Sequence, residues 1–327
     1  MFNFLKKNLL FLLFPLLIIL FSDFTLRTQN SLYKEKYKGA KDAVDSIEIL
    51  ILGNSRANYG VDPEAFDLYA YNLANLAQSI YFDKRIALSL LPDLPNLKYV
   101  FISIDYHSLA FSSQFNRDYW SYYGNGIKYK ETNYVFANLS PTLFGYTPKV
   151  AYAMMKKRIL NYLKHGEEAL DFEVQEGVDI YKPVVKGFIA FEGRDTTHFT
   201  EEAFDSLTDS YAEIIERSDE KEEIVADLED FVQILQANKV VPILLTAPTY
   251  SGYNEHLNKS YIQSNLEASK HIAERYDIEY WDFQNSDLFN LDDFYDMEHL
   301  NRKGALKFST MLNDSINNMK TKFKATN

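Results

Sequence analysis

The stretch IEILILGNSR, residues 47–56, carries the clearest structural signal in this chain. Its first six residues are aliphatic except for one glutamate, and Gly53 follows them directly. A short apolar run that ends in a turn residue is typical of a buried strand in a parallel sheet. We therefore predict a first strand over residues 46–52, followed by a tight turn that carries Ser55.

Three later runs have the same character, and helix-like segments separate them. The predicted strands are residues 99–104, 240–246 and 278–282. The predicted helices are residues 81–91, 219–238, 260–276 and 301–320. This alternation predicts an α/β fold of the doubly wound type, in which helices cover both faces of a parallel sheet.

Residues 107–200 interrupt the alternation. They are rich in Tyr, contain scattered Gly and Pro, and show one helical stretch at residues 148–165. We interpret them as an insertion into the α/β domain. Because ligands in open α/β sheets bind beyond the carboxyl ends of the strands, an insertion after the strand at 99–104 is expected to form a lid over the site.

The N-terminus resembles an export signal. Lys6 and Lys7 precede an unbroken apolar run at residues 9–21, which is the order of charge and hydrophobicity that secretion machinery handles. No small-residue cleavage site follows, so an uncleaved signal anchor that holds residues 8–26 in the membrane is favoured over a cleaved signal peptide. A short basic tail is easily retained on the cytoplasmic side, so we expect an extracytoplasmic domain, periplasmic or at the cell surface.

The predicted organisation is an N-terminal signal anchor or signal peptide, residues 1–27, and a single domain, residues 28–327. A net charge of −12 excludes nucleic acid as a partner, because binding to phosphates rests on Lys and Arg. The absence of Cys excludes disulfides, thiolate metal sites and a thiol nucleophile. No metal-ligand spacing and no glycine-rich phosphate loop is present, so neither a metal nor a cofactor is expected.

Ser55 is the candidate nucleophile. A sharp turn after a strand can expose a hydroxyl and direct nearby backbone N–H groups at one point. The alternative is ordinary turn chemistry, in which Ser55 caps the next helix.

Asp296 and His299, close to the C-terminus, are the candidate partners of Ser55. An Asp three residues before a His can bind its Nδ1 atom, which leaves Nε2 to accept the serine proton. Asp195 and His198 share this spacing but lie in the insertion. The last loop of a doubly wound sheet lies beside the turn after its first strand, so the later pair is favoured. The earlier pair is interpreted as a lid turn held by local hydrogen bonds, or alternatively as a substrate contact.

A strand that leads into Gly53-Asn54-Ser55, together with the late Asp296 and His299, resembles the SGNH (GDSL-like) hydrolase superfamily. The resemblance spans about residues 47–110 and 239–312. Among its branches the chain is most similar to membrane-anchored, extracytoplasmic DltD-like proteins and to O-acyltransferases and esterases of cell-envelope glycans. The resemblance implies a flavodoxin-like sheet and a catalytic triad, with the Ser55 N–H in the oxyanion hole.

Two features of the superfamily are missing here. Its second block supplies a glycine donor, whereas this chain has Ala74 and Asn75 at the corresponding place. We expect either backbone N–H to replace the glycine, with the Asn75 side chain as a second donor; the alternative is turn and cap chemistry. The asparagine of its third block is replaced by Asp105, which is expected to orient loops, and nearby His107 either donates to substrate or has a local partner.

Arg56, directly after Ser55, either binds an anionic group of the substrate or pairs with a surface carboxylate. The resemblance implies a serine esterase or O-acyltransferase that acts on acyl (acetyl) esters of a cell-envelope or exported glycan. Its expected partners are that acylated glycan, the membrane, and a protein of envelope or polysaccharide biosynthesis. The alternative, which the missing glycine and asparagine favour, is a catalytically impaired SGNH-like module that binds a glycan or an assembly partner.

Overall fold

The computed structural model describes residues 2–28, 30–112, 122, 127, 140–166 and 184–325. The chain divides into two compact units. The N-terminal unit consists of Met1–Lys34 and Phe115–Glu173, and the α/β unit consists of Glu35–Gln114 and Val174–Asn327. The segment predicted to be an insertion therefore contributes residues to both units.

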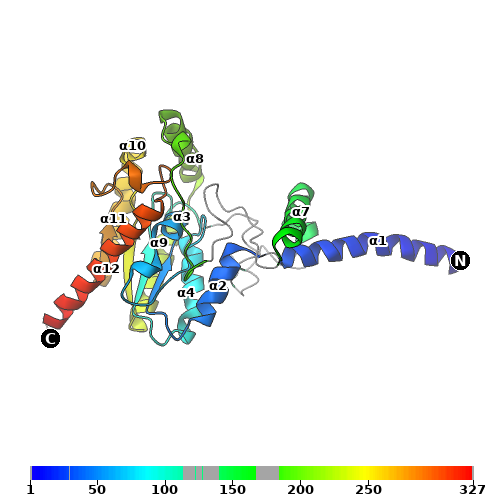
Figure 1. Cartoon of the computed structure of the whole chain (residues 1–327), viewed down its shortest axis with the longest axis horizontal. Coiled ribbons are helices and arrows are strands. Elements are labelled where there is room, and N and C mark those ends of the chain that lie inside the picture. Colours follow the sequence, from blue (N-terminus) through cyan, green and yellow to red (C-terminus); the bar gives the residue numbers. More distant parts are fainter. Residues whose placement is uncertain are drawn as a thin grey trace. The chain divides into compact units, whose positions relative to one another are not determined.

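The α/β unit is built on five parallel strands in the order β2-β1-β3-β4-β5, and Figure 1 shows helices packed around them. These strands are β1 (Ile49–Leu52), β2 (Ala70–Asn72), β3 (Tyr99–Ser103), β4 (Val241–Thr246) and β5 (Glu279–Asp282). The prediction of an α/β fold with a parallel sheet is confirmed, and all four predicted strands are present. The fifth, β2, has only three residues and was not among them.

Both faces of the sheet are buried along its central strands β1, β3 and β4. On one face, Ile51, Phe101 and Ile243 lie side by side on β1, β3 and β4 and belong to one apolar cluster. On the opposite face, Leu50 and its neighbour Val100 are equally inaccessible to solvent. Full burial on both faces explains why these strands are continuous apolar runs and not alternating ones.

Helices connect and cover the strands. They are α2 (Leu32–Asp42), α3 (Ser55–Gly60), α4 (Ile80–Leu90), α8 (Glu201–Arg217), α9 (Lys221–Ala237), α10 (Ser251–Asn254), α11 (Lys259–Tyr276) and α12 (Arg302–Ala325). Short helical turns are η1 (Pro63–Ala65), η2 (Leu91–Asp93), η5 (Thr196–His198) and η6 (Leu291–Asp293). Helix α12 shows why these helices form: Ala305, Phe308, Leu312 and Ile316 repeat at helical spacing and pack into the cluster under β1.

The N-terminal unit contains α1 (Phe2–Arg27), η3 (Pro141–Gly145) and α7 (Pro148–His165), and the last two pack against α1. The Asp23 carboxylate joins η3 to α1, because it accepts hydrogen bonds from the Ser140 hydroxyl and the Thr142 N–H, each at 3.0 Å. The helix predicted at residues 148–165 is confirmed.

No single helix of the described residues is long and apolar enough to cross a membrane. The part of α1 from Phe11 to Arg27 reaches the required length and composition only together with α2. The signal anchor at residues 1–27 therefore stays a prediction.

Candidate active site

The turn after β1 has a geometry that requires glycine at its first position. Gly53 has φ of +134°, and a Cβ atom there would lie 2.3 Å from the Cβ atom of Ser103. Asn54 caps α3, since its side-chain oxygen accepts the Arg56 N–H at 3.0 Å. Ser55 is therefore the first residue of α3 and lies at the carboxyl edge of the sheet.

Ser55, His299 and Asp296 form one hydrogen-bonded chain. The Ser55 Oγ lies 2.8 Å from His299 Nε2, and His299 Nδ1 lies 2.9 Å from both carboxylate oxygens of Asp296. The Asp296 Oδ1 atom also accepts the N–H groups of Glu298 and His299, each at 2.8 Å. The three side chains selected from the sequence are thus in contact, in the order that proton transfer from the serine requires.

Electrostatics keep Asp296 ionised. Burial raises the pKa of Asp296, but His299 and the backbone N–H donors outweigh it, so its pKa lies below the ordinary value. Burial lowers the pKa of His299, but Asp296 outweighs it, so its pKa lies above the ordinary value. The carboxylate therefore orients the ring and stabilises the imidazolium that a proton transfer would create.

Phe191, from the end of the predicted insertion, and Tyr59, on α3, pack beside the histidine. Phe191 bridges to Asn301, and its ring stacks on that of Tyr295 with ring centroids 4.1 Å apart. The rings of Phe191 and Tyr59 lie 5.6 and 5.7 Å from the His299 ring. This packing encloses the His299 side chain, of which 6% is exposed.

The rival pair, Asp195 and His198, forms a local turn. Asp195 caps η5 by accepting the Thr197 N–H at 3.0 Å, and its other oxygen lies 3.0 Å from His198 Nδ1. The His198 side chain is 48% exposed. This arrangement agrees with the interpretation as a turn held by its own hydrogen bonds.

The two backbone N–H groups expected in the oxyanion hole are already used within the fold. The Ala74 N–H donates to Asn72 Oδ1 at 3.0 Å, and the Asn75 N–H donates to the Gly53 carbonyl at 3.0 Å. The expectation is corrected accordingly, because the tight turn after β2 directs both donors at neighbouring backbone and amide oxygens. The Ser55 N–H, in the first turn of α3, is the backbone donor that a developing oxyanion could use.

Arg56 points into the α/β unit, with only 2% of the residue exposed. Its Nη2 donates to Glu298 Oε1 at 2.5 Å, and its Nη1 lies 3.7 Å from Asp105 Oδ1. The hydroxyl of Tyr211, on α8, donates to both Glu298 oxygens at 3.1 Å. Of the two alternatives for Arg56, the structure shows the carboxylate pair, and it is buried where a surface pair was expected.

His107 has a local partner next to the nucleophile. Its ring stacks between those of Phe111 and Tyr211, with centroid distances of 5.6 and 4.8 Å. Burial lowers its pKa to about 4, so the neutral ring accepts the Asn54 amide at 3.3 Å. Asn54 is thereby fixed on both sides, and with it the start of α3.

Lys36 is a buried residue of this region that the sequence analysis did not identify. Its ammonium group donates to Asn58 Oδ1 at 2.6 Å, to Asn72 Oδ1 at 3.4 Å and to the Ala74 carbonyl. Burial lowers its pKa well below the ordinary value. Lys36 ties α3 to the segment after β2 and so supports the turn that carries Ser55.

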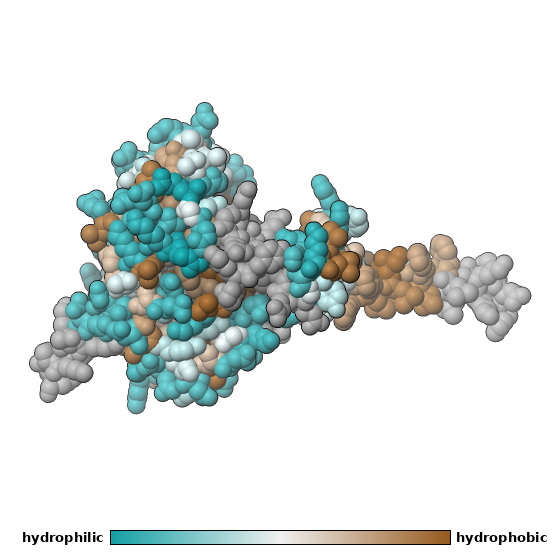
Figure 2. All heavy atoms as spheres, viewed as in Figure 1, coloured by the Kyte–Doolittle hydropathy of each residue, from teal (hydrophilic) through white to brown (hydrophobic). Residues whose placement is uncertain are grey.

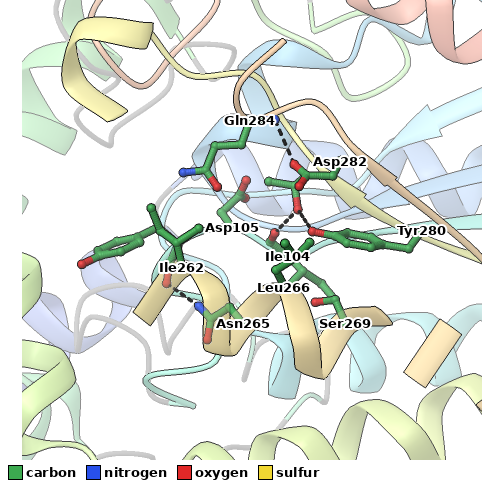
Figure 3. A pocket seen from close by; sticks show the side chains of 11 residues that line it. Ile104, Asp105, Ile262, Asn265, Leu266, Ser269, Tyr280, Asp282 and Gln284 are labelled. Atoms are coloured by element: carbon green, nitrogen blue, oxygen red, sulfur yellow. Dashed lines mark hydrogen bonds between the residues drawn. The ribbon is translucent and has the colours of Figure 1, made fainter. Parts of the chain in front are cut away.

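A small cavity with both polar and apolar lining lies beside Asp105 at the carboxyl ends of β3, β4 and β5 (Figure 3). Its volume of about 20 Å³ holds one water-sized group, not a sugar ring. The Thr246 hydroxyl closes one side, donating to the Ile104 carbonyl at 2.7 Å and lying 2.9 Å from the Tyr280 hydroxyl. The cavity has room for a single hydroxyl group next to Asp105, the carboxylate that lies near Arg56.

Asp83, on α4, makes the stability of the nucleophile turn depend on pH. Its Oδ1 accepts the Gly53 N–H at 3.0 Å and the Gln78 amide at 2.6 Å. Burial raises its pKa from 3.8 to about 8, so the folded state retains a proton that the unfolded chain releases. The stability contributed by this proton is full at low pH and is lost as pH rises toward 8.

Asp83→Asn mimics the protonated carboxyl and is expected to remove this loss. Relative to the native chain, the variant should gain on the order of 1 kcal/mol in the free energy of unfolding per pH unit between these two pKa values. Urea unfolding of both chains at several pH values measures the gain, and exposed Asp209→Asn is the control. A gain that does not vary with pH would contradict the assignment of the proton to Asp83.

The site thus combines the Ser55 hydroxyl, the His299 imidazole as a candidate base in contact with it, and the Asp296 carboxylate that orients the imidazole. Within the ranges that the structure describes, no three His, Cys, Asp or Glu side chains are placed to hold a metal ion. Comparison of the chain with protein-family models and with curated proteins finds no match.

Proposed function

We propose that this chain is a serine esterase or O-acyltransferase of the SGNH type. The observation that carries the proposal is the hydrogen-bonded chain from Ser55 through His299 to Asp296. His299 would take the proton of Ser55 as the serine oxygen attacks the acyl carbonyl, and would then return it to the departing alcohol. Water or a second hydroxyl would release the acyl group from Ser55 by the same steps in reverse.

The position of these groups along the chain supports the SGNH assignment. The nucleophile follows β1 in Gly53-Asn54-Ser55, and Asp296 and His299 directly precede the last helix, α12. The resemblance implies that the turn after β1 and the loop before the last helix meet at the carboxyl edge of the parallel sheet. The substrate we propose is an acyl ester, such as an acetyl ester, of a cell-envelope or exported glycan.

The proposed location is the outer side of a membrane, with α1 as the anchor. Its support is that apolar residues of α1 from Phe11 to Phe24 lie exposed around the helix, where water would disfavour them. A protein of envelope or polysaccharide biosynthesis is the proposed protein partner.

A second candidate function is an SGNH-like module that binds a glycan without turning it over. The observation that favours it is the use of the Ala74 and Asn75 N–H groups within the fold. Loss of one oxyanion donor typically lowers turnover about a hundredfold or more.

Covalent labelling separates the two candidates. We expect a fluorophosphonate probe to label the full chain in detergent at Ser55, because the Ser55–His299 contact activates the hydroxyl for attack on an electrophile. Ser55→Ala should abolish the label, and Ser210→Ala, on the exposed side of α8, should retain it. A native chain that neither reacts with the probe nor hydrolyses p-nitrophenyl acetate would favour the binding module.

A further inference from the structure

Helix α7 carries an unusual concentration of positive charge. Lys149, Lys156, Lys157, Arg158 and Lys164 lie within Pro148–His165, a segment without a single Asp or Glu. The chain as a whole has a net charge of −12, so this helix differs in sign from most of the sequence. Such a local reversal indicates a partner that is itself anionic.

The same helix exposes large apolar side chains. They are Val150, Tyr152, Ile159, Leu160, Tyr162 and Leu163, and Leu163 is 73% exposed. Tyr152, Ile159 and Leu163 are separated by seven and four residues, so they form one stripe along the helix. Basic and large apolar side chains on one exposed helix are typical of helices that lie in the interface of an anionic membrane.

The neighbouring turn adds to this surface. Leu143 and Phe144 of η3 are 54% and 56% exposed. Both follow Thr142, whose backbone N–H is bound by Asp23 of α1. Apolar side chains are thus exposed on α1, on η3 and on α7 within one compact unit, and Figure 2 shows apolar residues gathered along α1 and beside basic ones on α7.

Asp23 fixes the position of η3 along α1, next to the end of the apolar part of that helix. The residues of α1 from Phe11 to Phe21 are all apolar, and all except Ile19 are exposed. Ser22 and Asp23 then form the buried polar contacts that hold η3. If α1 lies in a bilayer, this change from apolar to polar marks the interface, and η3 and α7 follow at that depth.

We propose that η3 and α7 lie on the surface of an anionic lipid bilayer beside α1. Leu143, Phe144 and the apolar stripe of α7 enter the boundary between headgroups and acyl chains, while the Lys and Arg side chains extend to lipid phosphates. The N-terminal unit is then a membrane-binding unit with two contacts, one from α1 and one from α7. The inference rests on the proposed membrane location of α1 and does not depend on the chemistry at Ser55.

The absence of Cys allows a direct test on the full chain, since any introduced Cys is unique. Leu163→Cys on α7, Phe14→Cys on α1 and Lys270→Cys on the exposed side of α11 would each carry one environment-sensitive fluorophore. The labelled chains are reconstituted into vesicles of phosphatidylcholine, with or without about a third phosphatidylglycerol. Iodide in the water phase and a spin-labelled lipid then quench each label.

We expect the Leu163 label to be protected from iodide and quenched by the lipid in anionic vesicles, and to lose most of that protection in neutral ones. Adding Lys156→Glu, Lys157→Glu and Arg158→Glu together should also remove it, whereas the Phe14 label should stay protected in every case. The Lys270 label reports exposure to water throughout.

Two results would overturn the proposal in distinguishable ways. A protected Phe14 label with a Leu163 label as exposed as that of Lys270 would show that α7 faces water or a protein partner. A Phe14 label that iodide quenches fully would remove the membrane location of α1, and the inference with it. Neither result affects the labelling of Ser55 by a fluorophosphonate. That separate experiment would therefore show whether the proposed chemistry fails.

Discussion

Replacing Asp296 with asparagine is expected to lower turnover of p-nitrophenyl acetate by about a thousandfold or more. The amide cannot stabilise the imidazolium, and its NH₂ group favours the wrong tautomer of His299, whose Nδ1 lies 2.9 Å from the carboxylate. Steady-state kinetics of the full chain measure the loss. Asp195→Asn is the matched control, because Asp195 holds His198 with the same spacing and should leave turnover unchanged.

The same pair of variants gives a pH signature. Turnover requires neutral His299, so it falls as pH decreases through the pKa of that ring, which lies above the ordinary 6.5. Asp296 is the main group that raises this pKa, so the residual activity of Asp296→Asn should fall off at a lower pH than that of the native chain. An unchanged profile, or an equal effect of Asp195→Asn, would contradict the assignment of His299 as the base.

Arg56→Met is expected to lower the free energy of unfolding by about 3–5 kcal/mol. The substitution leaves the buried carboxylates of Glu298 and Asp105 without their cation. Burial raises the pKa of Glu298, but Arg56 outweighs it and holds that pKa below the ordinary value, so the variant should also favour protonation of Glu298. Urea unfolding at neutral pH measures the loss.

An exposed pair on α8 provides the control for this experiment. Arg217 lies 3.6 Å from Glu213, and both side chains are largely in water, so Arg217→Met should change the free energy of unfolding by less than about 0.5 kcal/mol. Glu298→Gln added to Arg56→Met should restore part of the loss. Equal effects of the two arginine substitutions would show that burial of Arg56 does not determine its contribution.

The strands and the order of the triad could be predicted because their signals are local. Residues 47–52 are apolar at nearly every position, and a strand buried on both faces has that pattern. Asp296 and His299 are three residues apart, so their contact depends on one turn and not on the fold. Only the meeting of His299 with Ser55 required an argument from topology, namely that the carboxyl ends of parallel strands lie at one edge.

What could not be predicted depends on contacts between distant segments. Strand β2 has three residues, Ala70–Asn72, too few to show a period. Lys36 lies in a polar segment typical of a surface helix, and only the packing against Asn58 and Asn72 makes it a buried donor. The pairing of Arg56 with Glu298 joins residues 242 positions apart, and neither has a neighbour in sequence that would indicate it.

The distance along the chain between Ser55 and His299 also has a consequence for synthesis. β1 and Ser55 leave the ribosome 244 residues before His299, and Phe308 and Leu312 of α12, which complete the core beneath β1, follow later still. Ser55 therefore lacks its histidine partner while the intervening residues are translated. The proposed acyl chemistry requires His299 in contact with Ser55, so a product truncated before residue 299 is expected to be inert.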